Sequence, residues 1–329
     1  MTDAPPMLVA EPDSPYHDRK TGLVIFGIVE ILMGGLAGAL IGLIVFGQFM
    51  MAKATQQEVQ LRMIVPGALT YGIAAVALIT LGIGSIRTRR WARALSLVMA
   101  WAWLITGILV LGSMAIFLPS VMRAAPPGGP GMPPGAMAVV MVSAFAIVGI
   151  LFILVPAVLV VFYQSRHVKA TCEARDPQLR WTDACPLPVL GLSLWVGVAA
   201  ISMLGMPLMM NGMFPVFGVL WSGWSGSLLY LAVAGLWVYC AMALYRLNAA
   251  GWWLMLASMG LFTASAWISF SRIDIFELYR QMGYSEAQLQ MMRQFSFISS
   301  ATMAKFTLAG FLPMLGYLLV VKRYFRHAG

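Results

Sequence analysis

Residues 164–186, QSRHVKATCEARDPQLRWTDACP, form the longest polar run between two strongly apolar halves of the chain. Four long apolar segments precede this run and four follow it. A helix rises 1.5 Å per residue, so about 20 apolar residues cross the roughly 30 Å hydrocarbon core of a bilayer. The sequence therefore predicts an all-α polytopic integral membrane protein with about eight transmembrane helices.

The composition supports a membrane location. Of the 329 residues, 60% are hydrophobic and only 10% are charged, whereas soluble domains carry about 25% charged residues. The net charge is +9, but the basic residues cluster at the ends of apolar runs. Because that distribution is typical of membrane orientation signals, membrane lipid is an expected partner and nucleic acid is not.

Four regions are expected: a disordered cytoplasmic tail (1–20), a first four-helix membrane half (21–163), a central cytoplasmic loop (164–186) and a second four-helix half (187–329). The first apolar run is longer than the about 7–15 residues of a signal-peptide core, so it is predicted to remain as the first helix. The predicted spans are 22–46, 67–86, one ending near 117, 137–163, 187–210, 227–244, 251–269 and 302–321.

Two connections carry capping-box patterns that predict short outer surface helices. The pattern at Thr55 predicts a helix within residues 48–63. The pattern at Ser285 predicts a helix over residues 286–297, with Leu289, Met292 and Phe295 as its buried stripe.

Proline and glycine mark three further features. Residues 118–136 are rich in both and are predicted to form a flexible loop. Residues 211–226 are interpreted as an interfacial or re-entrant piece anchored by tryptophan. Pro156 predicts a kink in the fourth span.

The distribution of lysine and arginine favours one orientation. Most of these residues lie in the N-terminal tail, after the second predicted span, in the central run and at the C-terminus. Because cytoplasmic segments carry an excess of basic residues, both termini are predicted to be cytoplasmic, with the protein in the cell membrane.

The two halves share features that suggest an internal duplication. Trp91 follows the basic end of the second span, Trp252 follows the basic end of the sixth, and the fourth and eighth spans carry Pro156 and Pro313. Parallel repeats of this kind are a known membrane architecture. The alternative is that a shared apolar composition alone produces the similarity.

Glu30 is the strongest candidate for a functional residue. It lies about nine residues into the first predicted span, roughly 13 Å from its start, and an acid within a membrane is costly. Gly34, Gly38 and Gly42 follow at four-residue spacing on the same helix face, and such small residues allow close helix packing. The alternative is a protonated Glu30 that serves only to hold helices together.

Lys305 is the second intramembrane candidate, because it is the only basic residue well inside a predicted span. Glu30 would be its natural partner, but the two differ by roughly 10 Å in predicted depth. Lys305 is therefore expected to extend towards the outer interface.

Two patterns could in principle bind metals. The methionine-rich run at residues 203–213 offers thioethers for Cu(I), but methionine is also a common apolar filler, and Pro207 is expected to interrupt the helix. His167, Cys172 and Cys185 match no zinc-finger spacing. Neither a metal nor a cofactor is predicted.

The central run is instead interpreted as a basic loop on the inner membrane surface, with Trp181 as its anchor. Asp176 and Asp183 are expected to form salt bridges to the inner ends of the spans.

No catalytic residue set is predicted, because no usable nucleophile, zinc-protease or phosphate-loop motif occurs. The sequence favours a non-enzymatic scaffold, sensor or complex subunit, with a protein partner or a second copy. The alternative is a small-solute or proton-coupled transporter that uses Glu30.

Overall fold

The computed structural model describes residues 16–55, 61–124, 136–282, 284, 286–293 and 299–325. Among them are eight helices long and apolar enough to cross a membrane, which confirms the all-α polytopic fold. The first half comprises α1 (Lys20–Thr55), α2 (Leu61–Ile86), α3 (Arg90–Ala124), α4 (Ala136–Gly149) and α5 (Val155–Gln164). The second half comprises the long helices α7 (Leu187–Met209), α8 (Gly223–Tyr245), α9 (Ala249–Arg272) and α12 (Ser300–Val321).

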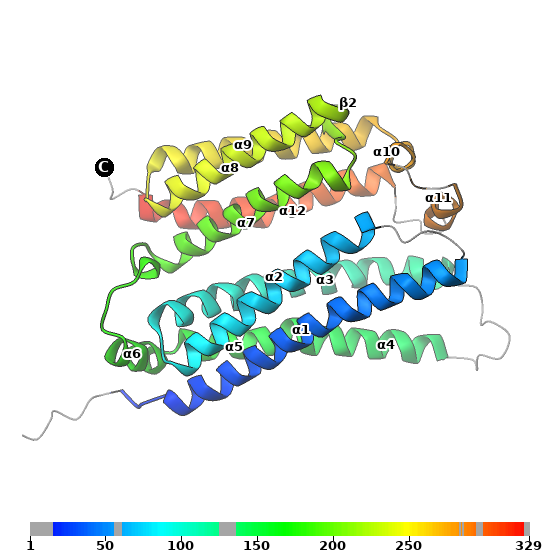
Figure 1. The fold of residues 1–329 in the computed structure, drawn as a ribbon. Helices are drawn as coiled ribbons and strands as arrows, with labels where there is room; N and C mark the ends of the chain where they lie inside the picture. The colour runs from blue at the N-terminus through cyan, green and yellow to red at the C-terminus, as the bar shows by residue number, and fades with distance from the viewer. Residues whose placement is uncertain are drawn as a thin grey trace, which may run out of the picture.

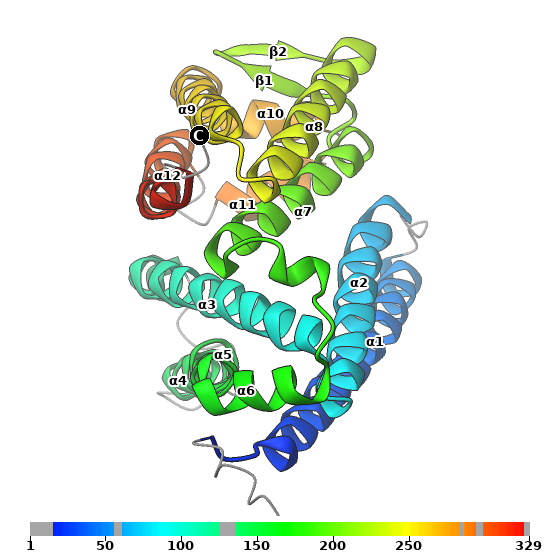
Figure 2. The same cartoon turned by 90° about the vertical axis from the view of Figure 1, so that its left-hand side faces the viewer.

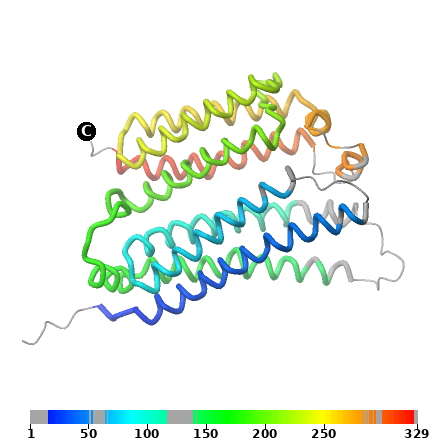
Figure 3. The backbone as a smooth tube through the Cα atoms, viewed as in Figure 1, coloured from blue at the N-terminus to red at the C-terminus, as the bar shows by residue number. Residues whose placement is uncertain are grey.

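The long helices run side by side, and the connections gather at the two ends of the bundle (Figure 1). One end, which we call the α6 end, holds α6 (Arg166–Arg175), the start of α1 and the C-terminal end of the described chain. The opposite end, which we call the α11 end, holds α10 (Ile275–Gln281) and α11 (Glu286–Arg293). The tube in Figure 3 follows the chain back and forth between these ends.

Each half packs its helices in the same order. In the first half α1 lies against α2, α2 against α3, and α3 against α5; in the second, α7 lies against α8, α8 against α9, and α9 against α12. Each half has its own core, one around Leu23 and Tyr163 and the other around Leu244 and Trp252. Figure 2 shows the halves stacked, with α7 meeting α2 and α3 between them.

The chain at the α6 end is more ordered than the sequence predicted. Residues 164–186 are not a loop, because they contain α6 and a short 3-10 turn (Trp181–Asp183). The predicted tail is also wrong for residues 16–20, since Arg175 forms an ion pair with Asp18 at 2.7 Å and the Arg19 amide donates to the Thr171 hydroxyl at 3.0 Å. Residues 1–15 lie outside the described residues.

Two predicted connections are absorbed into long helices. The separate surface helix within 48–63 is wrong, because residues 48–55 continue α1 and residues 61–63 begin α2. Residues 48–55, QFMMAKAT, are mostly apolar and contain no proline, so the helix continues through them. Similarly, residues 118–124 belong to α3 rather than to a loop, while 125–135 lie outside the described residues.

The irregularity expected at Pro156 is a π-helical turn (Ile150–Leu154) between α4 and α5. Proline has no N–H, so Pro156 cannot bond to the carbonyl of Phe152 four residues earlier. Gly107 of α3 lies against that carbonyl, because a Cβ on Gly107 would be 2.0 Å from the Phe152 oxygen. A glycine is thus what lets α3 approach the interrupted span.

Residues 211–226 form a β-hairpin and the start of α8. Strand β1 (Phe214–Val216) pairs antiparallel with β2 (Val219–Trp221). Phe217 and Gly218 form the two-residue turn, both with positive φ, as this hairpin type requires. Ser265 and Ser269 of α9 accept hydrogen bonds from the amides of this turn, which holds the hairpin on the bundle.

The surface helix predicted from Ser285 is present as α11, although Ser285 and residues 294–298 lie outside the described residues. Leu289 is fully buried and Met292 is half-buried, as the apolar stripe predicts. Arg293 lies over the ring of Phe276 in α10, so the two short helices pack together.

Candidate functional site

Glu30 is buried in a cluster of hydroxyl groups between four helices. Only 2% of the residue is exposed. The hydroxyl of Ser85 in α2 donates to its Oε2 at 3.2 Å, and lies 2.9 Å from the hydroxyl of Tyr163 in α5. The Ser96 hydroxyl of α3 lies beside both the Glu30 carboxyl and the Tyr163 hydroxyl. We call Glu30, Ser85, Ser96 and Tyr163 the hydroxyl cluster.

The Ser96 hydroxyl is the unsatisfied member of this cluster. Ser96 is 3% exposed, and its Oγ makes no hydrogen bond of good geometry to any described group. A buried polar atom without a partner costs about 1–3 kcal/mol, so such atoms are rare and call for an explanation.

The cluster lies towards the α6 end of the bundle. Glu30 is well inside α1, but Ser85 and Tyr163 occupy the last turns of α2 and α5. Gly27 of α1 lies against Gly82 and Ile86 of α2, at the end of that helix. The Glu30 backbone therefore lies about one turn inside the end of α2, and its side chain spans that distance to reach Ser85.

Lys305 is not part of this site. Its side chain is exposed near the start of α12, which begins at the α11 end, far from the hydroxyl cluster (Figure 1). This placement agrees with the expected separation from Glu30.

Of the three glycines predicted to share a helix face with Glu30, only one is in close contact with α2. A Cβ on Gly34 would lie 2.9 Å from the Ala75 carbonyl oxygen of α2, whereas Gly38 has only an ordinary contact at 3.9 Å and Gly42 has none within 4 Å. Towards the α11 end, Ile41 and Ile44 of α1 reach across to α2 and separate the two helices.

The closest approach of α1 and α2 instead lies on the other side of Glu30. A Cβ on Gly27 would be 2.7 Å from the Gly82 carbonyl oxygen, and a Cβ on Gly82 would be 2.5 Å from the Gly27 carbonyl oxygen. This reciprocal contact brings the two backbones together one turn from the carboxyl group.

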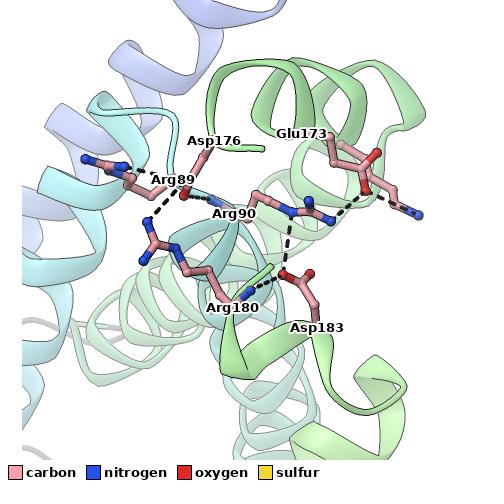
Figure 4. A network of polar contacts seen from close by, with 7 residues as sticks. Arg89, Arg90, Glu173, Asp176, Arg180 and Asp183 are labelled. Atoms are coloured by element: carbon pink, nitrogen blue, oxygen red, sulfur yellow. Dashed lines mark hydrogen bonds and ion pairs between the residues drawn. The ribbon is translucent and has the colours of Figure 1, made fainter. Parts of the chain in front are cut away.

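An ionic network covers the same end of the molecule (Figure 4). It joins the start of α3 to α6 and to the 3-10 turn. We call it the ionic hub; its members are Arg89, Arg90, Lys169, Glu173, Asp176, Arg180 and Asp183. The expectation that Asp176 and Asp183 pair with the ends of the spans is confirmed, since they contact Arg89 and Arg90 at 3.5 Å each.

Asp176 is the centre of the hub. Its side chain is 3% exposed, and it accepts hydrogen bonds from Arg180 at 3.1 Å and from the Arg90 amide at 3.4 Å. Burial alone would raise the pKa of Asp176, but these bonds and the charges of Arg180 and Arg89 lower it below the ordinary value. The carboxylate therefore also places a negative charge at the N-terminus of α3, where the helix dipole favours one.

The structure gives no support to either of the two possible metal-binding patterns in the sequence. Among the described residues no group of three or more His, Cys, Asp or Glu side chains could hold a metal ion. Burial raises the pKa of Cys172 and of Cys185 to about 11, which disfavours the metal-binding thiolate. In the methionine run, Met213 is buried while Met209 is exposed, and α7 continues past Pro207 to Met209 instead of stopping there.

No protein-family model, curated protein or solved structure matches this chain. The site must therefore be interpreted from its own chemistry. Sequence reasoning found Glu30 because a charge stands out in an apolar run, but it missed Ser85, Ser96 and Tyr163. Isolated hydroxyl residues are common in membrane helices, so nothing local marks these three as partners.

Proposed function

We propose that this multi-pass membrane protein is non-enzymatic and acts as a sensor or as the membrane subunit of a complex. The observation that carries the proposal is that the two buried acids of the described residues, Glu30 and Asp176, both lie towards the α6 end. The hydroxyl cluster and the ionic hub both lie at the α6 end. Hydroxyls farther along the spans, such as those of Thr106, Ser113 and Thr307, bond to carbonyls of their own helices. The hydrogen bonds of these three hydroxyls stay within one helix and do not connect the two ends.

The proposal places the α6 end and both termini in the cytoplasm. Its support is the concentration of lysine and arginine at that end. A reporter enzyme that is active only outside the cytoplasm, fused after Gly329, should be silent, whereas the same reporter inserted between α10 and α11 should be active. The reverse pattern would contradict this orientation.

Proton-coupled transport through Glu30 is the second candidate function. The observation that favours it is a buried carboxyl whose contacts are hydroxyl groups rather than a basic side chain. Such intramembrane acids commonly serve proton relays.

A flux measurement separates the two candidates. The purified chain is reconstituted into vesicles containing a pH-sensitive dye, beside empty vesicles and vesicles with Glu30→Gln. We expect an imposed pH gradient to decay equally in all three, while an added protonophore collapses it. A faster decay that Glu30→Gln abolishes would overturn the non-transport proposal and establish proton movement through this site.

A further inference from the structure

The turns that follow α2 and α8 have the same geometry. Thr88 and Leu247 both have positive φ, at 54° and 57°. The Thr88 amide bonds to the Ser85 carbonyl, and the Leu247 amide bonds to the Leu244 carbonyl, each at 2.9 Å. Thr88 and Leu247 therefore occupy equivalent positions in the two halves.

Packing across these turns is equivalent as well. Counting from Thr88 and Leu247, Gly84 pairs with Ala243 and Ala92 pairs with Gly251. A Cβ on Gly84 would lie 2.5 Å from the Ala92 Cβ, and a Cβ on Gly251 would lie 2.4 Å from the Ala243 Cβ. In each half, a glycine therefore packs against an alanine across the turn. The glycine precedes the turn in the first half and follows it in the second.

The same counting from Thr88 and Leu247 pairs Gly82 of α2 with Ala241 of α8. The contacts of these two residues then align α1 with α7, the first helices of the halves. Gly27 of α1 lies against the Gly82 carbonyl, and Ser193 of α7 donates to the Ala241 carbonyl at 2.7 Å. Counting from Gly27 and Ser193 pairs Glu30 with Val196.

The alignment shows what the second half places where the first half has its hydroxyl cluster. Glu30, Ser85 and Ser96 are equivalent to Val196, Leu244 and Met255. All six are buried, and the last three belong to the apolar core of the second half. The same arrangement of helices is therefore built without a carboxyl or a hydroxyl at these positions, so packing alone does not account for the cluster.

We propose that the halves are structural repeats and that Glu30, Ser85, Ser96 and Tyr163 form a binding site for one alkali metal ion. One carboxylate balances one positive charge, and hydroxyl oxygens are the hard ligands that such ions prefer. The Ser96 hydroxyl is buried beside the Glu30 carboxyl and the Tyr163 hydroxyl and makes no hydrogen bond of good geometry, so it is available to the ion. Ser85 and Tyr163 lie in the last turns of α2 and α5, whose negative dipole ends favour a cation.

The groups that face Glu30 are Ser85 from α2, Ser96 from α3 and Tyr163 from α5. The nearest basic residue on the same face of α3 is Arg93, one turn closer to the hub. Its charge interacts favourably with Glu173 and Asp183 and unfavourably with Arg90, so the two acids offset only part of its repulsion of a bound cation. The proposal goes beyond the proposed function and does not require transport.

Thermal unfolding of the purified full chain tests the site through binding rather than flux, because a ligand that binds the folded state raises its melting temperature. Sodium chloride and choline chloride are compared at equal ionic strength and constant pH, and a pH series is recorded in choline. A saturable sodium-dependent rise that Glu30→Gln abolishes identifies an alkali-ion site. A rise on acidification that Glu30→Gln abolishes, without a sodium response, would show only that Glu30 itself is protonated and would overturn the alkali-ion site. If neither response distinguishes the parent from Glu30→Gln, the cation site is refuted.

A triple variant tests the repeat argument. Glu30→Val, Ser85→Leu and Ser96→Met together install the residues of the second half. We expect this protein to fold, to melt in choline at or above the temperature of the parent, and to lose the cation response. Misfolding of the triple variant beside a stable Glu30→Gln protein would overturn the claim that packing does not need the cluster.

Discussion

Replacing Gly82 with Leu should destabilise the protein strongly, with a cost at or above the range of about 1–3 kcal/mol that is typical of overpacked cores. Its Cβ would already lie 2.5 Å from the Gly27 carbonyl oxygen and 2.7 Å from Ile31. Because the obstacle is partly helix backbone, only a separation of α1 from α2 relieves the clash. That separation would also break the Ser85–Glu30 hydrogen bond. The melting temperature in detergent measures the effect.

Gly42→Leu is the matched control, because it makes the same substitution on the helix that pairs with α2. Nothing lies within 4 Å of a Cβ at Gly42, and the residue is exposed. Both variants gain the about 1 kcal/mol by which leucine exceeds glycine in helix propensity, so their difference isolates the packing cost. Equal melting temperatures for the two variants would show that the α1–α2 contact at Gly82 is not close.

Asp176→Ala should release α6 from α3 and cost about 2–3 kcal/mol. Breaking a buried ion pair costs about 3–5 kcal/mol, but the Arg89 and Arg180 side chains are 43% and 32% exposed, and solvent screens part of that cost. Cys172 of α6 is buried, so its labelling by a maleimide should become faster. The rate is read by mass spectrometry.

Glu173→Ala is the control for this variant. Its side chain is 41% exposed and pairs with Arg90 and Lys169, so its loss should cost less than about 1 kcal/mol. Asp176→Ala labelled no faster than Glu173→Ala would contradict the central role of Asp176.

The contribution of Asp176 also has a defined pH range. Its pKa in the folded protein lies below the ordinary value of 3.8. The stability that it contributes is therefore present above the pKa of the unfolded chain and is lost as the pH falls through the lowered pKa. The stability difference between the parent and Asp176→Ala should stay constant at neutral and mildly acidic pH, and should shrink only at more acidic pH.

The number and order of the spans could be predicted because a bilayer imposes a minimum apolar length, which a single sequence displays. Helix ends were harder to predict: residues 48–55, QFMMAKAT, remain helical because most of them are apolar and none of them breaks a helix. The glycine spacing identified Gly34 but missed the contact between Gly27 and Gly82. The distance between two helices depends on the residues of both, such as Ile41 and Ile44, and not on the period of one.

The candidate site was predicted only in part, for a related reason. A lone acid such as Glu30 is visible in an apolar run, whereas its partners come from three other helices. The acids of the hub were easier, since Asp176 and Asp183 had basic span ends within reach of a short connection.

The ionic hub also has a consequence for the order in which the protein is made. Synthesis proceeds from the N-terminus, so Arg89 and Arg90 leave the ribosome before the acids of α6 and the 3-10 turn that pair with them. The docking surface of α6 therefore exists when α6 emerges, and pairing needs no residue of the second half. Since α7 begins directly after the hub and contacts α2 and α3, the hub anchors the nascent chain at the point from which the second half must start.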